Sequence, residues 1–410
     1  MRKIYLCIVI IALLIYCLYF FLSKDSYNLK NLDEIKFCGS IKSGLKNPEG
    51  VIKLRLTYSD TLKNINKIIN FKNLRYLEIN DKNLDSIPDV VFKLRKLQVL
   101  VLNRNKIQSI SKDIKSLENL RRLELAWNNF QSLSNEIYSL RKIEILNLKC
   151  NNLVRVTDDI LNLKNLKCLN IAFNKDLNYD ELFFLLSKLP KFEELTLGVK
   201  DFNRLPESIK LINNLRSITL GGRIGDFDLK HSLQLLSEIQ NLQDITLPYF
   251  IDELPKEIGL LKNLIKLYVN QSNIKEIPIE IGNLKKLKVL EIYPAKYIKV
   301  LPDEFYMLTE LQKAQLMWCS ITELKEDICK LKNLKYFNIH GANLSELPEC
   351  FGKLRNLEEL HLGYNKFNKL PSDISNWKSL KKLNLRDVDL ADNEKKRIEN
   401  VLNKTEIKFK

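Results

Sequence analysis

The chain has 410 residues, of which 45% are hydrophobic and 28% are charged. This composition excludes a disordered tail and a low-complexity linker, and it suits either two or three globular domains or one long repeat array. The formal net charge of +16 would indicate nucleic-acid binding only if the basic side chains gathered on one face.

The first 22 residues (1–22) form an apolar N-terminal segment. Arg2 and Lys3 precede an uncharged run of 19 residues, IYLCIVIIALLIYCLYFFL, at positions 4–22. A helix of that length spans about 28 Å, close to the roughly 30 Å hydrocarbon core of a bilayer. Because basic residues lie before the run and only the pair Lys24 and Asp25 follows it, we expect a cytoplasmic N-terminus and an outward-facing remainder.

Three fates of this segment remain open. A transmembrane anchor through residues 4–22 is favoured, because the run is long and no A-x-A-like cleavage site follows it. The alternatives are a cleaved signal peptide and lipidation at Cys17, where LIYC resembles a bacterial lipobox with Tyr16 in place of a small residue. All three place the protein in the cell envelope, as a single-pass membrane protein with an outward-facing repeat domain or as an exported or lipidated protein.

Residues 51–390 consist of units that recur about every 23 residues, a period that predicts a solenoid. Within each unit, the alternation L-x-L predicts a short strand with one buried face, and stacked strands form a parallel sheet. The second half of each unit has apolar residues at helical or 3-10 spacing and closes the coil. The fifteen units begin at Val51, Leu74, Leu97, Leu120, Ile143, Leu166, Phe192, Leu215, Leu242, Leu264, Leu287, Leu311, Leu334, Leu357 and Leu380.

The units follow the pattern L-x-x-L-x-L-x-x-N-x-L, which Leu120, Leu123, Leu125, Asn128 and Phe130 show cleanly. In this pattern the chain resembles the leucine-rich repeat family. The resemblance implies an α/β solenoid, a right-handed curved horseshoe of about 15 coils with a concave parallel β-sheet and convex short helices, 3-10 turns and loops. Tails such as LPKEI, IPIEI and LPSDI resemble the bacterial-type, Ras-group class of 23-residue repeats.

The ninth position of the unit is expected to carry an asparagine that hydrogen-bonds backbone groups left unpaired at the turn. This residue is present as Asn105, Asn128, Asn151, Asn174 and Asn365. From the seventh to the thirteenth unit it is replaced, and we expect less regular curvature there. The replacing residues are Lys200, Arg223, Phe250, Ser272, Ala295, Cys319 and Ala342.

Terminal coils of a solenoid need covers. Residues 23–50 are interpreted as a linker and N-terminal cap. Residues 391–410 are predicted to form a C-terminal cap, with a helix that turns Ile398, Val401 and Leu402 inward and a short strand with Ile407 and Phe409. Two longer units, NYDELFFLLSKLP and DLKHSLQLLSEIQ, predict amphipathic helices on the convex side.

The cysteines beyond the apolar run show no CxxC spacing and no paired framework, so we interpret them as small buried or half-buried hydrophobic residues. They are Cys38, Cys150, Cys168, Cys319, Cys329 and Cys350.

Side chains at the third, fifth and seventh positions are expected to line the concave surface, which the family resemblance implies is the partner-binding face. Basic and acidic residues are nearly balanced at these positions, so we expect the excess charge on loops and the convex side and no nucleic-acid partner. Aromatic and related side chains concentrate in the C-terminal half and form the predicted partner-binding site. They are Tyr249, Tyr268, Tyr293, Met317, Trp318, Tyr336, His340, His361 and Tyr364.

The same residues do not predict catalysis. His340 and His361 fall on adjacent strands as diagonal neighbours, but with only Glu359 nearby they complete neither a metal site nor a nucleophile–base pair. We expect no metal, no cofactor and no enzymatic activity. Bacterial ubiquitin ligases with leucine-rich repeats need a further catalytic domain with a nucleophilic cysteine, and the repeats here run nearly to residue 410.

The sequence therefore predicts a non-catalytic binding scaffold, membrane-tethered or exported, that recognises a protein or peptide partner on its concave face. A glycan partner is an open alternative for the same face. An intracellular signalling scaffold of the Ras-group type is the alternative for the whole protein.

Overall fold

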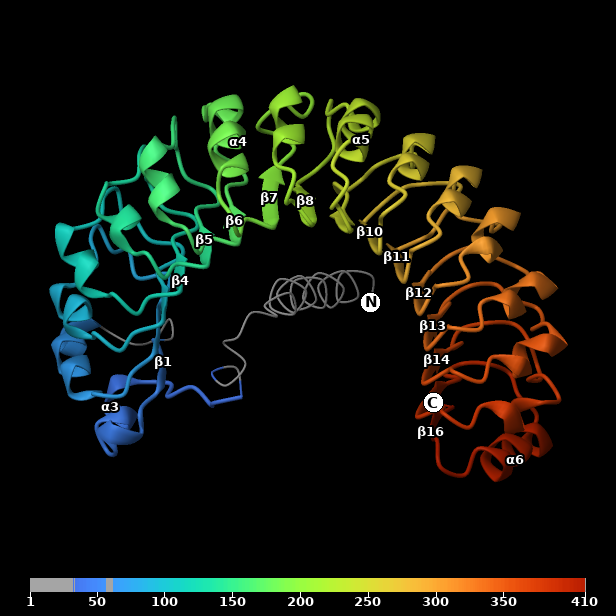
Figure 1. Cartoon of the computed structure of the whole chain (residues 1–410). Helices are drawn as coiled ribbons and strands as arrows, with labels where there is room; N and C mark the ends of the chain where they lie inside the picture. The colour runs from blue at the N-terminus through green and yellow to red at the C-terminus, as the bar shows by residue number, and fades with distance from the viewer. Residues whose placement is uncertain (1–31, 33, 57–61, 410) are drawn as a thin grey trace.

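The computed structural model describes residues 32, 34–56 and 62–409, in which the chain winds into an open horseshoe (Figure 1). One parallel sheet of 16 strands, ordered as in the sequence, lines the inner rim, and short helices line the outer rim. This confirms the predicted leucine-rich-repeat architecture. The apolar run 4–22 lies outside the described residues; none of the helices within them is long and apolar enough to cross a membrane.

The strands are β1 (Lys53–Leu56), β2 (Tyr76–Ile79), β3 (Val99–Val101), β4 (Arg122–Glu124), β5 (Ile145–Asn147), β6 (Cys168–Asn170), β7 (Glu194–Gly198), β8 (Ser217–Gly221), β9 (Asp244–Thr246), β10 (Lys266–Asn270), β11 (Val289–Tyr293), β12 (Lys313–Gln315), β13 (Tyr336–Asn338), β14 (Glu359–His361), β15 (Lys382–Asn384) and β16 (Glu406–Lys408). Each of the fifteen units contributes one strand, and β16 follows the last unit.

The convex side consists mainly of single-turn 3-10 helices, because a coil of about 23 residues leaves few residues for its return segment. They are η1 (Pro48–Gly50), η2 (Leu62–Asn70), η3 (Asp89–Lys93), η4 (Lys112–Ser116), η5 (Ile137–Ser139), η6 (Asp158–Asn162), η7 (Glu207–Leu211), η8 (Lys256–Leu260), η9 (Ile279–Asn283), η10 (Asp303–Met307), η11 (Glu326–Lys330), η12 (Glu349–Lys353) and η13 (Ile374–Asn376). The described α-helices are α3 (Ile41–Gly44), α4 (Tyr179–Ser187), α5 (Leu229–Ser237) and α6 (Asp392–Val401).

The two longer units form α4 and α5, as predicted. Each helix begins at a side chain that satisfies a free backbone N–H: Asn178 accepts from the Glu181 N–H, and Asp228 accepts from the His231 N–H. Elsewhere a proline commonly precedes the 3-10 turn, as Pro278 does before η9, where its φ of −64° suits the bend.

The core lies between the two rims and is continuous along the solenoid from Ile41 to Leu402. Neighbouring strands pair at equivalent positions of the repeat, so Leu77, Leu100 and Leu123 stack on one another and are fully buried. Each such leucine contributes about 1.5–3 kcal/mol through burial. The leucines therefore recur because each coil must pack against the coils on either side.

The expected asparagine ladder is present. Asn128 is buried, its amide donates to the carbonyl oxygens of Leu102 (3.0 Å) and Leu125 (3.1 Å), and its oxygen accepts from the Ile107 N–H at 3.0 Å. Asn151 repeats the same bonds one coil later. These asparagines satisfy turn groups that the strands leave unpaired.

The C-terminal coil is covered by α6 and β16. Ile398 and Leu402 are buried, and Ile407 and Phe409 pack against the core as predicted. The prediction for Val401 was wrong: this side chain is 40% exposed. Val401 is the last residue of α6, where the helix turns away from the coil below it.

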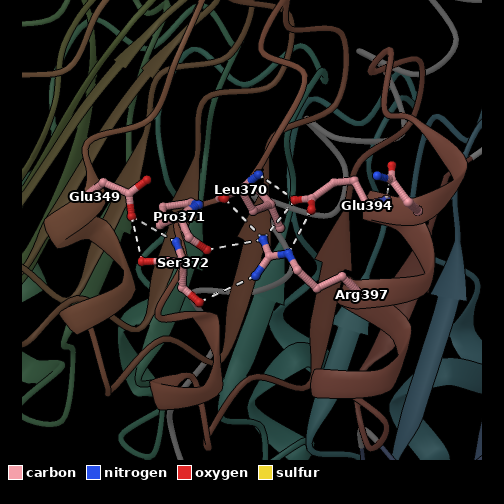
Figure 2. A network of polar contacts seen from close by, with 7 residues as sticks. Glu349, Leu370, Pro371, Ser372, Glu394 and Arg397 are labelled. Atoms are coloured by element: carbon pink, nitrogen blue, oxygen red, sulfur yellow. Dashed lines mark hydrogen bonds and ion pairs between the residues drawn. The ribbon is translucent and has the colours of Figure 1, made fainter.

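Polar contacts also join α6 to the return segment of the fourteenth coil (Figure 2). The Arg397 guanidinium donates to the carbonyl oxygens of Leu370 (3.1 Å) and Pro371 (3.2 Å), and it pairs with Glu394 at 2.7 Å. Glu394 in turn accepts from the Leu370 N–H at 2.9 Å. Although burial acts to raise it, these hydrogen bonds hold the pKa of Glu394 below its ordinary value. The cap thereby satisfies carbonyl and N–H groups that no further coil would meet.

The interpretation of all six cysteines as unpaired was wrong for two of them. Cys329 in η11 and Cys350 in η12 form a disulfide, with their Cα atoms 6.0 Å apart. Their spacing of 21 residues places them on adjacent turns of the convex side, a proximity that the stacking of the coils creates.

Candidate functional site

The concave face is covered at its N-terminal end by the chain itself. Leu32 is buried against Val99 and Val101, and its carbonyl oxygen accepts from the Lys53 Nζ at 2.8 Å. The Phe37 ring packs edge-on against Tyr76 with centroids 5.0 Å apart. The segment before β1 therefore occupies part of the surface that β1 to β3 would offer to a partner.

Charged side chains of the concave face are largely engaged with one another, in agreement with their balanced composition. Ion pairs join neighbouring strands or residues of one strand at 2.7–3.2 Å. They are Arg55–Glu78, Arg122–Glu124, Lys266–Asp244, Lys313–Glu291 and Lys382–Glu359. In each of these pairs the positive charge is balanced by a neighbouring carboxylate.

A cluster of three rings, the aromatic cluster, lies on the concave rim over β12 to β14. It consists of Trp318, His340 and Tyr364. The ring centroids of Trp318 and His340 are 5.1 Å apart, those of His340 and Tyr364 are 4.9 Å apart, and those of Trp318 and Tyr364 are 5.7 Å apart. Trp318 and Tyr364 remain 44% and 38% exposed, so the cluster offers a wide aromatic surface.

Backbone geometry holds these rings in place. Trp318 and Tyr364 occupy the left-handed region, with φ of 57° and 56°, at the turn that follows each strand. A Cβ on Gly341 would lie 2.3 Å from Trp318 Cε3, and a Cβ on Gly363 would lie 2.9 Å from His340 Nδ1. Because Gly341 and Gly363 have no side chains, the Trp318 indole and the His340 imidazole can pack directly against the backbone.

The second histidine lies beside the cluster. The rings of His361 and Tyr336 have centroids 5.3 Å apart, and the His361 Nε2 lies 3.6 Å from a Glu359 oxygen. Burial lowers the pKa of both His340 and His361, although Glu359 opposes the shift at His361. Burial thus favours the uncharged form of both imidazoles.

The other predicted site residues are less exposed than the sequence suggested. Tyr268 is only 8% exposed, so its place on an exposed track was wrong. Tyr293 and Met317 are half-buried beside the cluster, at the ends of β11 and β12. Tyr249 is half-buried and lines a different feature, the central hollow.

The central hollow is a concave cavity of about 460 Å³ that sequence analysis missed. Its floor includes Asn170, Thr196 and Thr219, which are paired in register on β6, β7 and β8. The signal in the sequence was Gly198 together with the pair Gly221 and Gly222, which removes side chains from the surface at these coils.

No nucleophile stands out among the described cysteines. Burial raises the pKa of the Cys319 thiol to about 11, which disfavours the reactive thiolate. The group of metal-type side chains found in the described ranges is Glu326, Cys329 and Cys350. Its two sulfur atoms bond to each other, so neither is available as a thiolate ligand.

Comparison with known proteins agrees with this geometry. The family model described as a leucine-rich repeat region matches residues 50–227 and 308–408, together more than half of the chain. A solved leucine-rich repeat protein of Leptospira interrogans is 29% identical and has a TM-score of 0.62. The alignment covers 92% of this chain and 100% of that protein.

Two curated relatives match over shorter stretches. The human volume-regulated anion channel subunit LRRC8A is 34% identical over 106 residues, which are 25% of this chain and 13% of that protein. The Arabidopsis thaliana disease resistance protein RPS4B is 30% identical over 159 residues, 36% of this chain and 13% of that protein. The chain thus matches only a small part of either relative, in a region whose size fits several repeats.

Proposed function

The chain belongs to the leucine-rich repeat family, and we propose that it is a non-catalytic scaffold that binds a protein or peptide partner through the C-terminal half of its concave face. This proposal rests on the aromatic cluster of Trp318, His340 and Tyr364. Partly exposed aromatic rings seated on a rigid sheet lose little side-chain entropy on binding, and such residues dominate the energetics of interfaces. A glycan is the alternative occupant of this cluster.

We also propose that the repeat domain faces outward in the cell envelope. Its parts would be residues 1–22 as anchor or signal, 23–50 as linker and cap, 51–390 as solenoid and 391–410 as C-terminal cap. The Cys329–Cys350 disulfide supports this placement, because disulfides persist mainly in oxidising compartments.

The alternative is an intracellular scaffold of the Ras-group type, favoured by the LPxxI tails. Protease treatment of intact cells separates the two. An outward domain is cut once the outer barrier is opened or where none exists, whereas an intracellular domain stays protected until the inner membrane is lysed.

The partner site is tested with the double variant Trp318→Ala/Tyr364→Ala. Envelope proteins captured by the wild-type chain are identified by mass spectrometry, and the dissociation constant of the purified partner is then measured by titration. We expect at least tenfold weaker binding, about 1.4 kcal/mol, since truncating central aromatic residues commonly costs more than that. The matched control is Phe184→Ala, which removes a 49% exposed ring on convex α4.

Unchanged affinity in a double variant with wild-type circular dichroism and melting temperature would show that the cluster does not carry the interaction.

A further inference from the structure

We propose that the central hollow is a second binding site, which takes a short, uncharged glycan and is separate from the aromatic cluster. Asn170, Thr196 and Thr219 lie side by side on β6, β7 and β8, because each is the register partner of the next. All three line the cavity, and all three are half-exposed. They form a strip of amide and hydroxyl groups across three adjacent strands.

The strip has unused hydrogen-bonding capacity. Within the residues that the structure describes, the hydroxyls of Thr196 and Thr219 make no side-chain hydrogen bond, and Asn170 uses only its oxygen, which accepts from the Ala172 N–H at 3.2 Å. Thr246 continues the row on β9. It lines the same cavity, is only 5% exposed, and its Oγ1 has no partner among the described atoms. An unpaired buried hydroxyl is costly, and a polar ligand would reduce that cost by hydrogen-bonding to this row.

Glycines shape the space above the strip. Gly198 and Gly221 are register partners on β7 and β8, so neither strand projects a side chain there. The Phe173 ring leans over this gap: a Cβ on Gly198 would lie 2.9 Å from Phe173 Cδ1, and a Cβ on Gly222 would lie 3.1 Å from its Cε1. The hollow therefore has a polar floor and an aromatic edge, and Tyr249 also lines it.

A carbohydrate matches this combination. A sugar ring presents hydroxyls that both donate and accept hydrogen bonds, and its C–H face packs against an aromatic ring. The strip itself carries no charge, which favours a neutral ligand. Of the basic residues that line the hollow, Arg55 pairs with Glu78 at 2.8 Å, Arg122 pairs with Glu124 at 2.7 Å, and the Lys149 Nζ lies 5.3 Å from the Phe173 ring centroid. A peptide would need apolar pockets for anchoring side chains, which the floor of threonines and asparagine does not offer.

The volume of the hollow also fits a short glycan. Its volume of about 460 Å³ falls within the roughly 300–1,000 Å³ of small-ligand pockets. The hollow is elongated, with a lining that runs from Arg55 on β1 to Asn270 on β10. The site therefore suits a few sugar units of a glycan chain.

The test uses the purified full-length chain in detergent and isothermal titration with maltohexaose, cellohexaose and chitohexaose. We expect at least one of these neutral sugars to bind. The variant Thr196→Val/Thr219→Val, which replaces two hydroxyls by methyl groups of similar size, should weaken that binding at least tenfold. Thr309→Val removes an exposed hydroxyl on the convex loop after η10 and serves as the matched control.

The second site is independent of the aromatic cluster, so Trp318→Ala should bind the sugar as the wild-type chain does. The proposal fails if no sugar binds, if the folded double-threonine variant binds unchanged, or if Trp318→Ala abolishes sugar binding. It also fails if the threonine substitutions instead weaken a peptide or protein partner, because the floor would then belong to the protein-binding surface. Absence of sugar binding, or unchanged sugar binding in the double-threonine variant, leaves protein binding at the aromatic cluster untouched, because Trp318→Ala/Tyr364→Ala tests that binding separately.

Discussion

Two stretches of the solenoid differ in the residue that stabilises the turn after each strand. Coils three to six carry the buried asparagine, whereas coils seven to thirteen carry other residues at that position. The central hollow spans both stretches, since its lining runs from Arg55 on coil one to Asn270 on coil ten. Trp318 and His340 of the aromatic cluster lie on coils twelve and thirteen, in the second stretch. The repeat thus departs from its asparagine pattern beneath most of the aromatic cluster, whereas the hollow lies over coils with and without the asparagine.

In the second stretch, other hydrogen bonds or small buried residues take the place of the asparagine ladder. At the seventh coil, Asp201 takes over part of the asparagine's role: its Oδ2 accepts from the Phe173 N–H at 2.7 Å and from the Tyr179 hydroxyl at 2.6 Å. Burial nevertheless raises the pKa of this carboxyl. Farther along, Ala295, Cys319 and Ala342 are simply small and buried. Packing of the neighbouring coils thus tolerates the loss of the asparagine.

The largest expected effect contrasts the two stretches directly. Asn128→Ala should lower the free energy of unfolding by about 2–4 kcal/mol, since it leaves several buried backbone groups unpaired. Ser272→Ala is the matched control at the same position of the repeat, where the Oγ is buried and has no partner among the described residues. Its effect should stay within about 0.5 kcal/mol, because no hydrogen bond is lost. Urea unfolding followed by circular dichroism measures both, and equal losses would contradict the distinction.

The disulfide offers a second way to sharpen the comparison, because it ties coil twelve to coil thirteen, where the ladder is absent. Cys329→Ser/Cys350→Ser should cost about 2–3 kcal/mol of stability, as expected for a closed loop of this length. Adding reductant should destabilise the wild-type chain by a similar amount and leave the double variant unchanged. Cys150→Ser, at a free and half-buried thiol, is the control.

Peptide mapping without reduction provides an independent check of the bridge. A wild-type chain purified from the envelope whose Cys329 and Cys350 peptides carry free thiols would show that the bond does not form in the cell.

The smallest expected effect is a pH dependence that arises at His340 in the aromatic cluster and at His361 beside it. Because folding lowers the pKa of His340 and His361, the unfolded chain binds more protons between the folded and unfolded values. Their contribution to stability is complete above the ordinary histidine pKa near 6.5 and is lost as the pH falls through the folded values. Partner affinity should fall over the same window.

Histidine resonances followed by NMR give the two pKa values, and His340→Gln/His361→Gln is the test variant. Acidification that lowers the stability and the partner affinity of that variant as much as those of the wild-type chain would show that the imidazoles are not the groups that respond to pH.

Much of this architecture could be predicted from the sequence. The unit starts gave every repeat strand, because a leucine at each repeat position can be buried only by an equivalent leucine in the next coil. Asn128 and its equivalents were identified for a similar reason, since a buried turn requires one amide in one place. Local patterns also predicted α4, α5 and the C-terminal helix and strand.

Other features could not be predicted, because they depend on neighbouring coils. Cys329 and Cys350 meet only when their turns stack, and Val401 is exposed because of where α6 ends. Tyr268 has a surface position in the repeat pattern, yet its side chain is buried. The Thr196–Thr219 strip has no motif at all, since its members are separated by a whole coil.

The sequence by itself determined the solenoid, its sheet and its asparagine ladder, because these depend on a pattern repeated within each unit. Only the tertiary structure decided which concave side chains stay exposed, which glycines seat a ring and where a hollow opens. The physical reason is that stacking brings residues about 23 positions apart within roughly 5 Å of one another. The pattern within one unit does not specify which side chains of the adjacent coils will lie beside it.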